Sequence, residues 1–152
     1  MIEKRKFKQL LNGAFIEGGF QRSGKSLIRE GADSTLVIGF QKSDFDEKYY
    51  INFGIWLKRL GPISAHPKPN QCHLNLRLSA IFPEEVRTIE EGGRTDSSSY
   101  ENLEKLIELI QKEFIPFSTD CLDEKMLRIH FSSGRLQKGL ILAAARKLLQ
   151  ES

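Results

Sequence analysis

Three segments in the first half of the chain alternate apolar and polar residues with a period of two, which is the pattern of a half-buried β-strand. They cover residues 35–40, 49–57 and 72–78. The short polar connection at 42–48 favours an antiparallel meander. The apolar positions that share one face are Leu36, Ile38, Phe40, Ile51, Phe53, Ile55, Leu57, Leu74, Leu76 and Leu78. The sequence therefore predicts a sheet with one buried face.

Apolar residues at helical spacing predict an amphipathic helix before these strands, at residues 3–17. Gly18-Gly19 supplies the left-handed cap that ends it. The next segment, 20–30, is typical of a β-hairpin with Ser23-Gly24 as its turn.

The second half of the chain predicts two to three helices. Ser98 and Glu101 have the spacing of a capping box, and the helix that they open should end before Pro116. A shorter helix is expected from about residue 120 to residue 130. The last helix, at about 134–150, has an almost continuous apolar centre, so we expect it in a helical layer or in a dimer interface.

Two connections interrupt this pattern. Three prolines predict an extended loop at 61–71. Loss of periodicity, with paired glycines and a run of serines, predicts a flexible loop at 83–99. The expected fold is α+β and forms a single domain over residues 1–152. It has an N-terminal helix, an antiparallel meander of four to five strands, and two to three C-terminal helices packed on the sheet.

Charge and composition exclude several classes of protein. The chain has 152 residues and a formal net charge of +3, which is well short of the basic footprint of a nucleic-acid-binding protein. No apolar run approaches the length of a membrane span, and the charged first residues do not resemble a secretory signal. Cys72 and Cys121 are too few for a disulfide framework. We therefore expect a cytoplasmic protein.

Residues 19–26 match the phosphate-loop pattern G-x-x-x-x-G-K-S. A phosphate loop leaves a buried strand and begins a helix at once, so that backbone N–H groups face the phosphates. Here a predicted helix precedes the pattern, and only residues 27–30 separate Ser26 from Gly31. A hairpin tip explains this segment better than nucleotide binding does.

Cys72 and His73 invite a metal site, but adjacent residues of a strand point to opposite faces and cannot easily chelate one ion. A Cys–His nucleophilic pair would require Cys121 to approach His73 in space, which the spacing does not indicate. The sequence thus identifies no catalytic residue, no metal and no cofactor. It leaves open whether the protein is an enzyme.

The opposite face of the predicted sheet carries an unusual set of polar residues. By parity it holds Asn52, Trp56, His73, Asn75 and Arg77. A solvated face more often carries Lys, Glu and Thr, whereas an indole offers a flat apolar anchor and a guanidinium can grip a carboxylate or phosphate with two hydrogen bonds. A structural alternative is a polar network that ties the sheet to a covering helix. The same face includes Val37, Gly39, Gln41, Gly54, Lys58 and Ser79.

Several short motifs occur in a fixed order. They are Gly19-Phe20 with Gly24 downstream, residues 40–43 (FQKS), residues 50–55 (YINFGI), and Cys72-His73 followed by Arg77-Leu78. In these motifs the chain resembles a bacterial family described as domain of unknown function 4304, over roughly residues 3–120. The resemblance implies a bacterial cytoplasmic protein with an early hairpin at Gly24. It carries no activity and no catalytic residue.

Two functions follow as hypotheses. The first is a non-catalytic binding module, of the immunity or regulatory kind, that holds a protein partner with the polar sheet face. The second is a small enzyme, or a binder of a small anionic ligand, with a pocket around Trp56, His73, Asn75 and Arg77. A closed pocket with an imidazole in hydrogen-bond reach of another polar group favours the second, and an open face favours the first. The protein is expected to be a monomer or a homodimer.

Overall fold

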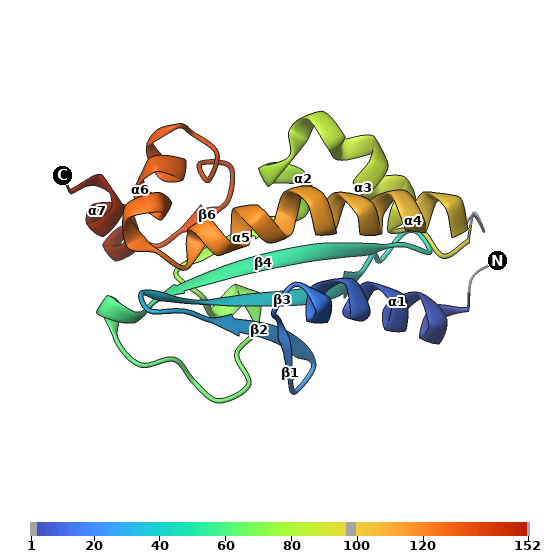
Figure 1. Cartoon of the computed structure of the whole chain (residues 1–152), viewed down its shortest axis with the longest axis horizontal. Helices are drawn as coiled ribbons and strands as arrows, with labels where there is room; N and C mark the ends of the chain where they lie inside the picture. The colour runs from blue at the N-terminus through green and yellow to red at the C-terminus, as the bar shows by residue number, and fades with distance from the viewer. Residues whose placement is uncertain (1–2, 97–99, 152) are drawn as a thin grey trace.

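One antiparallel sheet organises the computed structural model, which describes residues 3–96 and 100–151 (Figure 1). Its six strands lie side by side in chain order, and each neighbouring pair is antiparallel. They are β1 (Gln21–Ser23), β2 (Ser26–Glu30), β3 (Ser34–Lys42), β4 (Tyr49–Leu57), β5 (Leu74–Arg77) and β6 (Leu140–Ile141). The predicted α+β meander is confirmed, with six strands rather than four or five.

Helices cover the apolar face of the sheet, as Figure 1 shows. They are α1 (Lys4–Glu17), α4 (Tyr100–Leu109) and α5 (Ile115–Cys121). The Phe53 ring on β4 packs edge-on against Phe114 at 5.1 Å between centroids, and Phe15 of α1 meets the same ring at 5.6 Å. All of the predicted inward positions are buried except Phe40, which is half-buried. Burial of this alternating apolar set is what fixes the register of the strands.

The helix that was expected to end before Pro116 continues through it. A five-residue π-helical segment, η4 (Ile110–Phe114), joins α4 to α5, and Pro116 lies in the first turn of α5. A π-helical turn widens the backbone and rearranges its hydrogen bonds, so the missing proline N–H and the bulky ring are accommodated there.

The prediction of a flexible loop at 83–99 is wrong for the first part of that segment. A short turn, η3 (Pro83–Glu85), leads into helix α3 (Val86–Gly92). α3 packs on α4, and a Cβ added at Gly92 would lie 2.5 Å from the Cβ of Leu106. Two turns are too short for a visible period, so tertiary contacts such as this one stabilise the helix. The predicted capping box at Ser98 lies outside the described residues.

The last helix begins later than predicted. The expected helix at 120–130 is α6 (Glu124–Ser132), and the final helix is α7 (Ala143–Gln150) rather than 134–150. Between them the chain turns at Gly134, whose φ is +90°, and adds β6 to the edge of the sheet. Ile141 lies opposite Leu74 there, so part of the apolar run that suggested a helix completes the sheet instead.

The other face of the sheet carries the connection between β4 and β5, seen below the strands in Figure 1. It contains the short turns η1 (Lys58–Leu60) and η2 (Pro69–Gln71), with extended chain between them. After β5 the chain forms α2 (Leu78–Ile81), which places Ser79 on a helix rather than on the predicted strand. Within the described ranges, no helix combines the length and apolarity that a membrane crossing requires.

Candidate functional site: a cationic groove on the sheet

The polar face of the sheet has the register that the sequence predicts. Asn52 on β4 lies opposite Arg77 on β5, and Gly54 lies opposite Asn75. Directly opposed residues of antiparallel strands point to the same face. Asn52, Asn75 and Arg77 are therefore neighbours, which confirms the parity argument, while their role in binding stays a prediction.

Trp56 anchors the loop that covers one end of this face. Its indole Nε1 donates a hydrogen bond to the carbonyl oxygen of Gly61 at 2.8 Å. Its ring also lies against the imidazole of His73, with 4.0 Å between centroids. This is the structural alternative that the sequence left open, except that a loop rather than a helix covers the sheet.

His73 is likewise part of the framework. It is 7% exposed, and its Nδ1 accepts a hydrogen bond from the backbone N–H of Leu57 at 2.9 Å. An acceptor at Nδ1 leaves the proton of the neutral ring on Nε2. Burial lowers the pKa of His73 below its usual value of 6.5, which favours this neutral form.

The two glycines on this face leave room for the loop. A Cβ added at Gly54 would lie 2.7 Å from Sγ of Cys72 and 2.8 Å from Cα of Pro69, while one at Gly39 would lie 3.0 Å from the Pro69 ring. The close approach of another segment of backbone explains a glycine in a central strand. Burial there raises the pKa of the Cys72 thiol to about 12, so this thiol is protonated and unreactive at neutral pH.

Beyond the loop, the same face opens into a groove of about 780 Å³. Four cationic side chains line it, from four different elements of the chain, and none of the described lining residues is acidic. The cations are Lys25, Lys68, Arg77 and Lys138; the amides and hydroxyls around them are Gln41, Asn52, Asn70, Asn75, Ser26 and Ser79. Donors of this kind, without competing carboxylates, suit a negatively charged ligand.

Stacking of one face of its guanidinium on an aromatic ring holds the Arg77 side chain in place. The group lies over the Tyr50 ring, with 3.6 Å from Cζ to the ring centroid. Tyr50 is itself flanked by Lys48, whose ammonium lies 2.7 Å from a carboxylate oxygen of Glu90. Arg77 is exposed, and we find no ion pair or side-chain hydrogen bond for it among residues 3–96 and 100–151. Stacking therefore orients the guanidinium and leaves its N–H edges available for a carboxylate or phosphate.

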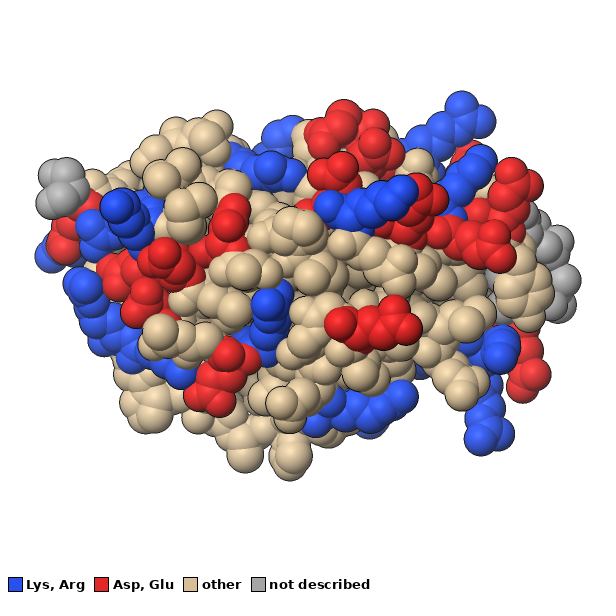
Figure 2. Space-filling model, in the orientation of Figure 1, with Lys and Arg blue, Asp and Glu red and all other residues tan. Residues whose placement is uncertain are grey.

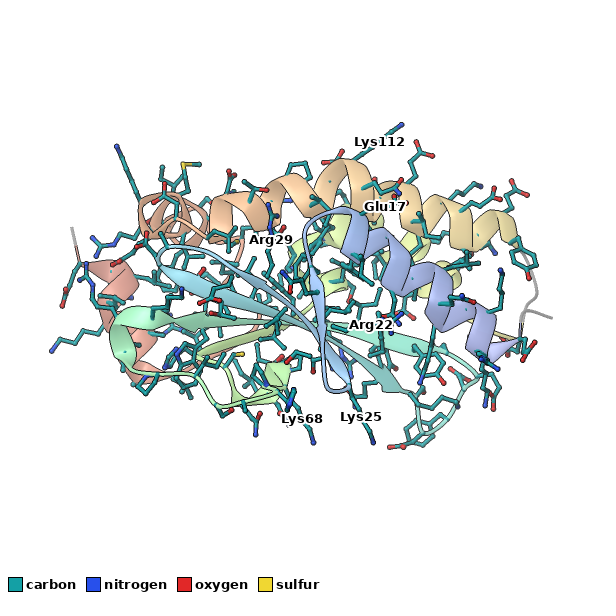
Figure 3. All side chains as sticks on the ribbon, turned by 60° about the horizontal axis from the view of Figure 1, so that its bottom comes forward. Glu17, Arg22, Lys25, Arg29, Lys68 and Lys112 are labelled. Carbon is teal, nitrogen blue, oxygen red and sulfur yellow. The ribbon has the colours of Figure 1, made fainter. Side chains whose placement is uncertain are left out.

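Lys25 and Lys68 form one rim of the groove. Figure 3 shows them side by side, Lys25 at the tip of the β1–β2 hairpin and Lys68 on the long loop. The hairpin and the loop touch through Ser23 Oγ and His66 Nδ1, which are 3.2 Å apart. His66 has a φ of +49°, an unusual conformation for a residue other than glycine. Two segments far apart in sequence thus bring Lys25 and Lys68 to the same rim of the groove.

The rest of the charged surface is different in kind. On the face drawn in Figure 2, acidic and basic side chains are interspersed. Among the described residues many charged side chains pair, such as Arg94 with Asp96 at 2.8 Å and Lys112 with Glu108 at 2.6 Å. The groove stands apart because none of the described residues that line it is acidic, although Arg77 also borders a small hollow with Glu90 and Lys138 borders one with Glu84.

The sequence prediction missed most of the groove's charge. Lys25 lies in the segment that matched a phosphate loop; the structure confirms the hairpin interpretation, because Ser26 begins β2 and no helix follows it. Lys68 and Lys138 lie in connections whose course only tertiary contacts decide. Conversely, Trp56 and His73 are not among the residues that line the groove.

None of the described residues that line the groove is a histidine, cysteine, aspartate or glutamate. His73 is turned into the framework, and the described parts of the chain contain no cluster of three or more His, Cys, Asp or Glu side chains that could hold a metal ion. Cys121 is buried, which raises the pKa of its thiol, and it is a free cysteine like Cys72. What the arrangement can do is bind anionic groups.

Fold and site together define a small α+β domain with a cationic groove on the loop-covered face of an antiparallel meander. Residues 11–120 match the family model of a domain of unknown function, DUF4304, and the chain belongs to this family. Searches of curated proteins and of solved structures found no match to the chain.

Proposed function

We propose that this chain is a non-catalytic binding module that holds an acidic segment of a protein partner in the groove. The observation that carries the proposal is the set of four cations, Lys25, Lys68, Arg77 and Lys138, around a lining that has no carboxylate. In the described structure none of the four forms an ion pair with a carboxylate, although many other cations do. Uncompensated like charges repel one another, so an anionic partner relieves an electrostatic cost of the free protein.

The shape of the site supports binding rather than catalysis. The groove is open to solvent along the sheet face, and the nearby imidazole of His73 is buried and already hydrogen-bonded. General acid–base catalysis needs a titratable group in hydrogen-bond reach of the bound reactant. An immunity or regulatory protein, by contrast, needs only an accessible recognition surface.

A second candidate is a binder of a small anionic ligand. The volume of about 780 Å³ falls within the range of small-molecule sites, which is roughly 300–1,000 Å³. In that case Arg77, Asn52 and Asn75 would hold the ligand, while Trp56 and His73 would keep the loop in place. The test below also detects this outcome.

The proposal includes a bacterial cytoplasmic setting. Support comes from the two free, buried thiols of Cys72 and Cys121, because small secreted domains usually pair their cysteines.

The test is binding of fluorescein-labelled hexaglutamate, followed by fluorescence anisotropy at low ionic strength. We expect Arg77→Ala to weaken binding by about ten- to a hundredfold, the effect of losing charge-assisted hydrogen bonds. Because Arg77 is exposed, the variant should lose less than about 1 kcal/mol of stability.

Arg87→Ala is the matched control. It removes the same charge from an exposed position on α3, where Arg87 pairs with Glu91 at 3.0 Å. It should bind hexaglutamate as the wild type does. Equal binding by Arg77→Ala and the wild type, or no binding of hexaglutamate to the wild type, would contradict the proposal. If inorganic phosphate or a single glutamate binds as tightly as hexaglutamate, the small-ligand candidate is the correct one.

A further inference from the structure

The groove runs across the strands rather than along them. Its lining takes Ser26 from β2, Gln41 from β3, Asn52 from β4, Asn75 from β5 and Leu140 from β6. Neighbouring strands are about 4.8 Å apart, so four spacings give the groove a length of about 19 Å. A single carboxylate or phosphate fills only a small part of that length.

A second hollow continues this path beyond Lys138. It has a volume of about 360 Å³ and shares Ala80 and Lys138 with the groove. Arg135 adds a further cation there; its guanidinium lies over the ring of Phe82 at 4.7 Å. The hollow also contains Glu84, the one acidic residue along the combined path among the described lining residues.

An apolar side chain lines the groove two residues after Lys138, which both hollows share. Leu140 on β6 is 75% exposed and lines the groove opposite Asn75. A leucine that projects from an edge strand into a polar groove offers contact for one apolar residue of a ligand. The path thus presents cations along its length and one apolar position near Lys138.

From these features we infer that the occupant is an extended acidic peptide, which crosses the sheet from the β1–β2 hairpin to β6, places an apolar side chain on Leu140 and passes Lys138 into the second hollow. This inference rests on the proposed function and adds the length, direction and composition of the ligand. An extended chain advances about 3.4 Å per residue, so the groove alone takes about six residues.

Recognition of this kind differs from the addition of a strand to the sheet. Strand addition uses the unpaired backbone of an edge strand and runs parallel or antiparallel to it. The groove lies on the face, where the backbones of β3, β4 and β5 are already paired on both sides. Side chains must therefore make the contacts, and the binding depends on charge and on Leu140.

The experiment compares three labelled peptides at low ionic strength: triglutamate, nonaglutamate, and a nonapeptide of glutamates with leucine at its centre. A repeating acidic peptide can shift along the groove to bring its leucine to Leu140. We expect nonaglutamate to bind about tenfold more tightly than triglutamate, because it reaches more cations. The central leucine should add about another tenfold, and Leu140→Asn should remove that gain.

Glu84→Gln tests whether the ligand enters the second hollow, because Glu84 lines that hollow and does not line the groove. It should tighten the binding of nonaglutamate about threefold through loss of like-charge repulsion, and leave triglutamate unchanged. Glu104→Gln, at an exposed position on α4, removes the same charge elsewhere and should change neither affinity.

The outcomes separate this inference from the proposed function. If triglutamate binds as tightly as nonaglutamate and Arg77→Ala abolishes both, the groove binds anions but the extended peptide is refuted. An unchanged affinity of the leucine peptide for Leu140→Asn refutes the apolar contact at Leu140. An unchanged affinity of nonaglutamate for Glu84→Gln refutes the path beyond Lys138. If no peptide binds the wild type, the proposed function itself fails.

Discussion

Replacing Gly54 by alanine should destabilise the protein by forcing the long loop off the sheet. The new methyl group would lie 2.7 Å from Sγ of Cys72 and 2.8 Å from Cα of Pro69, and the latter atom is backbone. Overpacking of this kind costs about 1–3 kcal/mol. The loss of chain entropy in the unfolded state offsets about 0.4–1 kcal/mol of that cost.

With the middle of each range, about 2 kcal/mol of overpacking less about 0.7 kcal/mol of entropy leaves a net loss in the free energy of unfolding of about 1.3 kcal/mol. For a chain of this size that corresponds to a fall in Tm of about 3–5 °C. Urea unfolding followed by circular dichroism measures the first quantity, and a thermal scan measures the second. Because Pro69 follows Lys68 on the rim, displacement of the loop should also weaken the binding of hexaglutamate.

Gly13→Ala is the matched control, with the opposite sign. Gly13 lies inside α1, and a Cβ added there meets no atom within 4 Å among the described residues. Alanine is favoured over glycine in a helix interior by about 0.5–1 kcal/mol, so this variant should be more stable than the wild type. If Gly54→Ala is as stable as Gly13→Ala, the loop does not pack on the sheet as described.

Two further predictions concern the residues that hold the loop. Burial lowers the pKa of His73, so the unfolded chain binds the proton more readily and stability should fall as the pH drops below about 6.5. His73→Asn keeps an acceptor for the Leu57 N–H but removes the titrating ring. The urea midpoints of this variant at acidic and at neutral pH should therefore differ less than those of the wild type. An unchanged difference would exclude His73 as the cause of the pH dependence of stability. Trp56→Phe removes the hydrogen bond to Gly61 but keeps an aromatic ring against His73. In the same urea assay it should lower the free energy of unfolding by about 0.5–1.5 kcal/mol. An unchanged free energy of unfolding would mean that a hydrogen bond to solvent replaces the one to Gly61.

The sheet could be predicted because its signal is repeated along each strand. Once it is known which of the two alternating sets of residues faces the core, the alternation at 35–40 and 49–57 assigns every inward position. The observed register agrees, because it pairs Ile38 with Phe53, and both belong to the inward set. Elements of one or two turns carry no such repetition. Helix α3 and strand β6 owe their existence to contacts with α4 and β5, and those partners are distant in sequence.

The site could be predicted only in part, for a related reason. Parity brought together Asn52, Asn75 and Arg77, because the strand register alone fixes which residues share a face. It could not show which of these polar residues the loop would cover, since this depends on where Trp56 and the two glycines seat the segment around Pro69. Lys68 and Lys138 reach the groove from connections, where neither period nor pairing constrains position.

The sequence left two interpretations open for the polar face, a binding surface and a structural network. Each of them describes one half of that face. Trp56 and His73 form a network that ties the loop to one half, and this same loop carries Lys68 and Pro69 to the wall of the groove on the other half. The network therefore positions the wall of the groove, so the two interpretations do not exclude each other. A variant that loosens the loop, such as Gly54→Ala, should lower stability and affinity together, whereas Arg77→Ala should lower affinity alone. If the two variants affected stability to the same extent, loop and groove would not be separable parts of the structure.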